Sequence, residues 1–164
     1  MNKNWVGVDN GVSGSVGFLL YDGCYDYIHM PIKKELNYTK KKQWLNRIDV
    51  PKLIEELRPI APTNIPCFAL LERPLVNPKM FRATISAIRA LEATIIAFEI
   101  LKIPYAYCDS KAWQKELLPS GLEGKELKIA SLQVGKRLFP NLNLDGFSDC
   151  DGILIAEYAR RKGL

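Results

Sequence analysis

The order of strand and helix patterns along this chain restricts the folds that it can adopt. Three apolar runs of strand length come first and are separated only by short turns with Gly, at residues 5–9, 16–21 and 25–30. Two further strand patterns alternate with helical patterns, at residues 67–71 and 103–108. Short turns join antiparallel strands, whereas crossover helices join parallel ones. The chain therefore predicts an α/β fold: a mixed five-stranded sheet, three antiparallel strands followed by two parallel ones, flanked by helices.

Length and composition exclude several classes of protein. A chain of 164 residues with 48% hydrophobic residues is long enough for one good core, so we expect a single domain over residues 1–164. No signal segment or membrane-length apolar run is seen, which favours a soluble intracellular protein. A zinc site is not expected, because His29 is the single histidine and the four cysteines form no C-x-x-C pair.

Acidic side chains stand where the strand patterns end and the last helix pattern begins. Asp9 follows the first apolar run, Glu72 follows the run at 67–71, and Asp149 and Asp151 precede the last helix. Strand ends of such a sheet meet at one edge, where carboxylates suit Mg²⁺ or Mn²⁺. Two ions about 4 Å apart activate a water and stabilise the leaving oxygen of a phosphodiester. We predict a catalytic two-metal site formed by these four acids.

Each acid also has a simpler interpretation. Asp-Asn-Gly at 9–11 is typical of a plain hairpin turn, and Asp149 and Asp151 suit the start of a helix. On a regular helix, residues two apart diverge by about 200°, so both acids reach one site only if Asp149 lies in the turn before the helix. Asp151 is therefore the first choice as a ligand.

Basic side chains gather in three places, and the net charge of +5 is compatible with a polyanionic partner. The polar stretch at 33–47 is predicted as a connection, either a solvated loop or a flap that grips phosphates and stacks on bases. The long helix at 80–101 is expected to carry Phe81, Ile85 and Ile88 on one apolar face, which either belongs to the core or forms a dimer element. The predicted DNA contacts are Lys40, Lys41, Lys42, Arg82, Arg89, Lys125 and Lys128.

Taken in order, these motifs resemble those of RuvC-type Holliday-junction resolvases, in particular the compact phage-encoded branch, over nearly the whole chain. The segments that carry the resemblance are 6–14 with Asp9, 69–73 with Glu72, 86–93, 110–113, 125–140, and 149–156 with Asp151. The family usually places two acidic or histidine positions three apart in its last motif. Ser148 stands at the earlier position here, and Asp149 is the candidate substitute.

The resemblance implies an RNase H-like fold, a homodimer, Mg²⁺ as cofactor, and paired nicking of four-way DNA junctions, with Asp9, Glu72 and Asp151 as metal ligands. The phage branch would act in the cytoplasm of a bacterial host. Three alternatives remain open: an RNase H-like nuclease on RNA–DNA hybrids or flaps, a non-catalytic junction-binding protein, and an actin- or sugar-kinase-like nucleotide-binding domain. The last needs two lobes, and this chain is long enough for only one.

Overall fold

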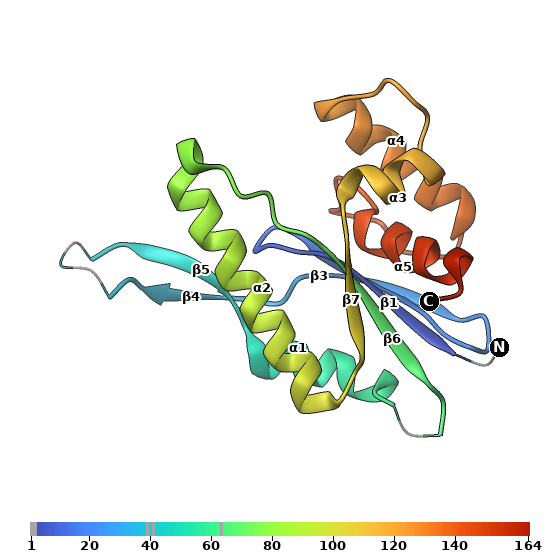
Figure 1. Ribbon diagram of the computed structural model, residues 1–164, viewed down its shortest axis with the longest axis horizontal. Helices are drawn as coiled ribbons and strands as arrows, with labels where there is room; N and C mark the ends of the chain where they lie inside the picture. The colour runs from blue at the N-terminus through green and yellow to red at the C-terminus, as the bar shows by residue number, and fades with distance from the viewer. Residues whose placement is uncertain (1–2, 39, 41, 63) are drawn as a thin grey trace.

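Five strands form the central sheet, in the order β3–β2–β1–β6–β7 (Figure 1). The computed structural model describes residues 3–38, 40, 42–62 and 64–164. The strands are β1 (Asn4–Asp9), β2 (Ser15–Leu19), β3 (Tyr25–His29), β6 (Cys67–Glu72) and β7 (Tyr105–Cys108). β1, β2 and β3 pair antiparallel, and β6 and β7 continue the sheet in parallel from β1. The predicted mixed sheet is confirmed.

Helices cover both faces of this sheet (Figure 1). One face packs against α1 (Val50–Leu57) and α2 (Phe81–Leu101), through the side chains of Val6, Val8 and Leu71. The other face packs against α3 (Ser110–Leu117), α4 (Gly124–Leu138) and α5 (Asp151–Lys162). Two short 3-10 turns, Arg58–Ile60 and Pro78–Met80, complete the helical segments of the described residues. Because both faces are covered, the central strands are apolar on both sides.

Two glycines in the sheet let α5 lie directly on it. A Cβ atom at Gly7 would lie 2.1 Å from the Gly152 carbonyl oxygen and 2.1 Å from the Ala156 nitrogen. A Cβ at Gly17 would lie 2.2 Å from the Ile153 Cα. The helix that begins with Asp151 is therefore held against β1 and β2 by backbone contact. This contact fixes the position of Asp151 relative to the end of β1.

Over its described residues, the stretch at 33–47 is a hairpin and not a solvated loop, and the alternative of a flap that contacts DNA stays a prediction. β4 (Ile32–Leu36) and β5 (Trp44–Ile48) form an antiparallel hairpin that extends away from the central sheet (Figure 1). Arg47 and Glu35 form an ion pair of 2.7 Å across it, and the base is anchored by buried Ile48. The lysine run concealed the strand pattern, because side chains on both faces of this hairpin meet solvent. Lys41 lies outside the described residues.

The apolar face of α2 does not belong to the core over its first turns. Phe81 is 68% exposed, and Ile85 and Ile88 are exposed as well, whereas Phe98 near the other end is fully buried. α2 packs against α1 and β5, so its first turns lie beside the hairpin rather than over the sheet. Apolar periodicity indicates which residues share a face but not whether another element covers it.

Cys67, Cys108 and Cys150 are buried, Cys24 is exposed, and all four are free thiols. Within the described residues, no helix combines the length and the hydropathy that a membrane crossing needs.

Candidate metal centre

Three carboxylates converge at the end of the central strand. Asp9 is the last residue of β1, Asp151 is the first residue of α5, and Asp149 lies in the turn before that helix. One oxygen of each lies within 4.8 Å of the others. Asp149 is outside the helix, which is the condition under which both acids of the last motif reach one site. The two-residue spacing is thus compatible with a shared site.

Glu72 approaches the same place from β6. The parallel register places Val8 beside Leu71, so β1 and β6 end side by side with Asp9 and Glu72 as their last residues. Glu72 is not one of the three acids within 4.8 Å of one another, but its charge raises the pKa of Asp9 and of Asp151. The fourth predicted acid therefore lies next to the compact set rather than within it.

Burial and mutual repulsion make this arrangement unfavourable without a cation. Burial, followed by the charges of Asp151, Glu72 and Asp149, raises the pKa of Asp9 well above its usual range. Burial is also the main cause that raises the pKa of Asp151 to about 6 and that raises the pKa of Glu72. A bound divalent ion would remove the repulsion, and carboxylate oxygens are the ligands that Mg²⁺ and Mn²⁺ prefer. The donor set thus fits a hard divalent metal.

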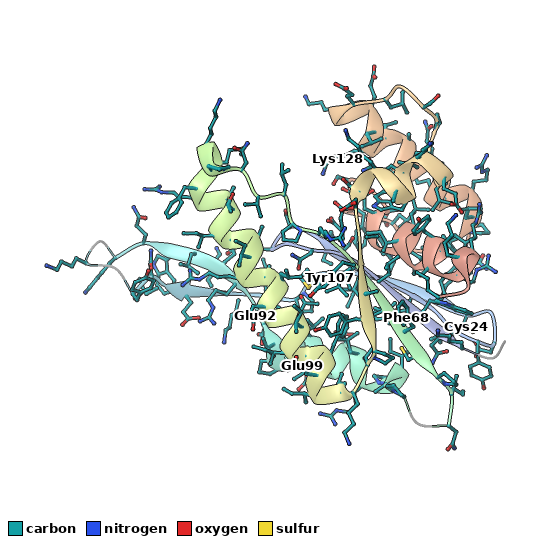
Figure 2. All side chains as sticks on the ribbon, in the orientation of Figure 1. Cys24, Phe68, Glu92, Glu99, Tyr107 and Lys128 are labelled. Atoms are coloured by element: carbon teal, nitrogen blue, oxygen red, sulfur yellow. The ribbon has the colours of Figure 1, made fainter. Side chains whose placement is uncertain are left out.

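α4 holds the acidic turn from the outside. Lys128 forms an ion pair of 3.1 Å with Asp149 Oδ2, and it extends from α4 toward the acids in Figure 2. One helical turn further on, the buried Ser131 hydroxyl donates to Asp151 Oδ1 and accepts from the Cys150 N–H at 3.0 Å. Residues three apart on a helix share a face, so both side chains meet the same turn.

β2 and β3 hold the turn from the sheet side. The Tyr27 hydroxyl lies 2.8 Å from Ser15 Oγ and 3.1 Å from the Asp149 carbonyl oxygen. Ser15 Oγ also accepts from the Gly152 N–H at 3.2 Å, and Ser15 pairs with Asp9 across the β1–β2 ladder. These buried hydrogen bonds restrict the position of the chain, because breaking one of them would leave a buried polar group without a partner and would destabilise the folded state.

Comparisons with known proteins were made at the level of sequence and of structure. No protein-family model matches the chain, and no curated protein matches it in sequence. The solved structure of T. thermophilus RuvC in complex with a Holliday junction substrate superposes with a TM-score of 0.63 at 11% identity. A second Thermus thermophilus RuvC structure gives 0.55 at 12% identity. Each comparison covers 98% of this chain and 96% of the other.

The chain has a RuvC-like fold. RuvC-like folds are RNase H-like, so the fold expected from the sequence resemblance is confirmed. At 11% and 12% identity, the likeness concerns the fold rather than individual residues.

The predicted DNA contacts that lie among the described residues are exposed, and they lie on two surfaces. Lys40 and Lys42 lie at the hairpin turn, and Lys125 lies at the start of α4, near Lys128. Arg82 and Arg89 line a groove of about 880 Å³ between β5 and α2, with Tyr38 and Trp44 on its other side. The guanidinium of Arg89 lies 5.9 Å from the centre of the Tyr38 ring.

Sequence reasoning did not identify the groups that hold the acids in place. Trp113 is fully buried, and its indole N–H donates to Glu72 Oε2 at 2.6 Å. Asp109 directly precedes α3, where it forms an ion pair of 2.7 Å with Arg73 and no side-chain capping bond. Single polar residues on helices carry no local pattern, so no signal in the sequence could have selected Ser131 or Trp113.

Proposed function

We propose that the chain is a metal-dependent, structure-selective DNA endonuclease that resolves four-way and related branched DNA junctions by paired nicking. The observation that carries this proposal is the meeting of Asp9, Asp149 and Asp151 at the end of the central strand of a RuvC-like fold. One of the superposed RuvC structures is a complex with a Holliday junction substrate. We also propose that residues 1–164 form a single nuclease domain acting in the bacterial cytoplasm, as the phage-like motifs imply.

Asp9, Glu72, Asp149 and Asp151 would hold the metal, with Mg²⁺ as the proposed ion, Mn²⁺ as a substitute, and two ions per site. Bound divalent ions supply an activated water and stabilise the charge that develops on the phosphodiester. The four acids are oxygen donors from three separate segments, so the fold itself assembles the site. Ser131 keeps Asp151 oriented, and Tyr27 holds the backbone of Asp149.

The basic residues around the site would bind the DNA backbone. Lys128 is 58% exposed in its side chain and lies beside the acids, so a phosphate near the metal centre is within its reach. Lys125 lies one turn earlier on the same helix, and Lys40 and Lys42 form a second cationic point on the hairpin. Lys41 is assigned to the same hairpin contact from the sequence alone. Phosphate contacts of this kind position DNA without reading its sequence.

A comparison of substrates tests the nuclease proposal. We expect Mg²⁺-dependent nicks at symmetric positions of a four-way junction, leaving 5′-phosphates that ligase can seal, and no cleavage in EDTA. A linear duplex of the same sequence is the matched control and should remain intact. Preferred cleavage of an RNA–DNA hybrid or a flap would favour the RNase H-like alternative. Tight junction binding without cleavage in Mg²⁺ or Mn²⁺ would favour the non-catalytic one.

We propose further that two copies pair through α2. This helix carries five large apolar side chains that are exposed: Phe81, Ile85, Ile88, Ile96 and Ile100. Large apolar side chains that are exposed together along one helix indicate an interaction surface. An antiparallel pair would place Ile85 level with the partner's Ile96, and Phe81 level with the partner's Ile100. The face is therefore complementary to itself, as a two-fold interface requires.

The charged residues of α2 follow the same symmetry. In this antiparallel register, Arg89 is level with the partner's Glu92, and Arg82 is level with the partner's Glu99. All four charged side chains are exposed in the single chain, and Figure 2 marks Glu92 and Glu99 along the helix. Opposite charges at the same level favour the antiparallel over the parallel arrangement. The sequence prediction that Arg82 and Arg89 contact DNA remains a prediction, in competition with this pairing.

A charge swap tests the α2 pairing. Because Arg89→Glu brings like charges together twice in a two-fold dimer, we expect dimer dissociation to rise roughly 10- to 100-fold, measured by analytical ultracentrifugation. Arg89→Glu combined with Glu92→Arg should restore the dimer. Lys115→Glu on α3, across the sheet, is the matched control and should change nothing. A monomeric wild type whose Arg89→Glu variant loses junction binding would assign this arginine to DNA instead.

A further inference from the structure

Trp113 is the largest fully buried side chain of the chain, and it lies between α3 and the end of β6. Its indole Nε1–H donates a hydrogen bond of 2.6 Å to Glu72 Oε2. A buried indole N–H requires an acceptor, and here the acceptor is one of the four acids proposed to hold the metal. Trp113 therefore has a polar role in addition to its packing in the core.

Glu72 is the acid that most needs such a restraint. Asp9, Asp149 and Asp151 lie within 4.8 Å of one another, whereas Glu72 approaches them from the neighbouring strand. A glutamate has one more rotatable bond than an aspartate, so its carboxylate can turn away from a site that it only borders. The bond from Trp113 occupies Oε2 and leaves Oε1 available to a ligand.

The helix that carries Trp113 is itself attached to the same strand end. Arg73, the residue after Glu72, forms an ion pair of 2.7 Å with Asp109 at the start of α3. The backbone N–H of Arg73 donates to the Cys108 carbonyl oxygen at 2.9 Å. The ion pair joins the residue before α3 to the end of β6, and the backbone bond joins β6 to the end of β7. The segment that leads into α3 therefore lies beside Glu72.

We propose that Trp113 is a positioning residue that holds the Glu72 carboxylate in the orientation in which it binds metal. The inference rests on the proposed function in one respect, the assignment of Glu72 as a metal ligand. Trp113 acts through Glu72 alone and touches neither metal nor DNA. Groups that hydrogen-bond to metal ligands in this way typically change metal affinity by about 10- to 100-fold when they are removed.

Binding of Mn²⁺ by the DNA-free protein tests this role without any measurement of activity. Trp113→Phe removes the N–H, and we expect it to weaken one class of Mn²⁺ site by roughly 10- to 100-fold in electron paramagnetic resonance titrations. Trp5→Phe is the matched control: the indole nitrogen of Trp5 is also buried but has no hydrogen-bond partner among the described residues. Its Mn²⁺ affinity should equal that of the wild type.

A double-mutant cycle with Glu72→Gln separates positioning from general damage to the fold. If Trp113 acts through Glu72, Trp113→Phe should have no further effect on Mn²⁺ binding in the Glu72→Gln background. An equal loss in both backgrounds would overturn the proposal, as would wild-type affinity in Trp113→Phe. If Trp113→Phe does not fold, benzothienylalanine at position 113 keeps the shape of the ring without the N–H and allows the same comparison. The Mn²⁺ binding measurements do not depend on junction cleavage. Failure of the nuclease proposal can therefore be distinguished from failure of the positioning proposal for Trp113.

Discussion

Replacing Asp9 with Asn is expected to abolish junction cleavage and, at the same time, to stabilise the metal-free protein. Asp9 ends the central strand, and two further acids lie within 4.8 Å of it. The amide removes a negative ligand, so the ions bind more weakly and the developing charge loses its stabilisation. A loss of several kcal/mol in the transition state corresponds to roughly a thousandfold or more in rate.

The gain in stability follows from the raised pKa values. Burial and neighbouring carboxylates raise the pKa of Asp9, so its charged form destabilises the folded state. Burial likewise raises the pKa of Asp151 to about 6. The folded protein then binds protons more tightly than the unfolded chain, and the free energy of unfolding falls as pH rises from about 4 through 6. Asn is neutral throughout, so the stabilisation by Asp9→Asn should be present at pH 7 and absent near pH 3.

Thermal unfolding in EDTA and cleavage in Mg²⁺ measure the two effects on the same preparation. Asp145→Asn is the matched control, because Asp145 is exposed in the loop before α5 and lies outside the set of three close acids. It should change neither quantity. An Asp9→Asn variant that cleaves at the wild-type rate would contradict the metal site. One that loses stability at pH 7 would contradict the repulsion among the acids.

The central sheet and the positions of its acids could be predicted because both follow from local sequence patterns. The apolar runs that became β1 and β6 are short and continuous, and each ends at a carboxylate. Parallel strands end at the same edge, so Asp9 and Glu72 had to lie close together. Asp149 and Asp151 were ambiguous until the start of α5 was known, because a shift of one residue in that start changes which acid is helical.

The hairpin, the exposed face of α2 and the groups around the acids depend on tertiary contacts instead. Lys33 and Lys34 obscured β4, since a hairpin that meets solvent on both faces has no two-residue alternation. Ile85 and Ile88 lie on the apolar face that the sequence predicts, but the spacing of apolar residues does not indicate that this face is exposed in the folded chain. The hydrogen bond from Trp113 to Glu72 joins residues 41 positions apart in the sequence, and local sequence patterns do not predict contacts between such distant residues.

Replacing Gly7 with Ala is expected to unfold the protein partly and to displace the metal centre. The new Cβ would lie 2.1 Å from backbone atoms of α5, namely the Gly152 carbonyl oxygen and the Ala156 nitrogen. Backbone atoms inside a helix cannot turn away, so the whole helix must move off the sheet. Overpacking of this kind costs roughly 3 kcal/mol or more in the free energy of unfolding, which urea titration measures.

Gly23→Ala separates this steric effect from the general cost of replacing glycine. Gly23 has a φ of +89° in the β2–β3 turn, and a Cβ there would meet nothing within 4 Å. Backbone strain alone should cost about 1 kcal/mol, with Mn²⁺ binding unchanged. Gly7→Ala should in addition lose Mn²⁺ affinity, because Asp151 begins the helix that has moved while Asp9 stays with the sheet. Equal destabilisation by the two substitutions would mean that α5 does not rest on β1.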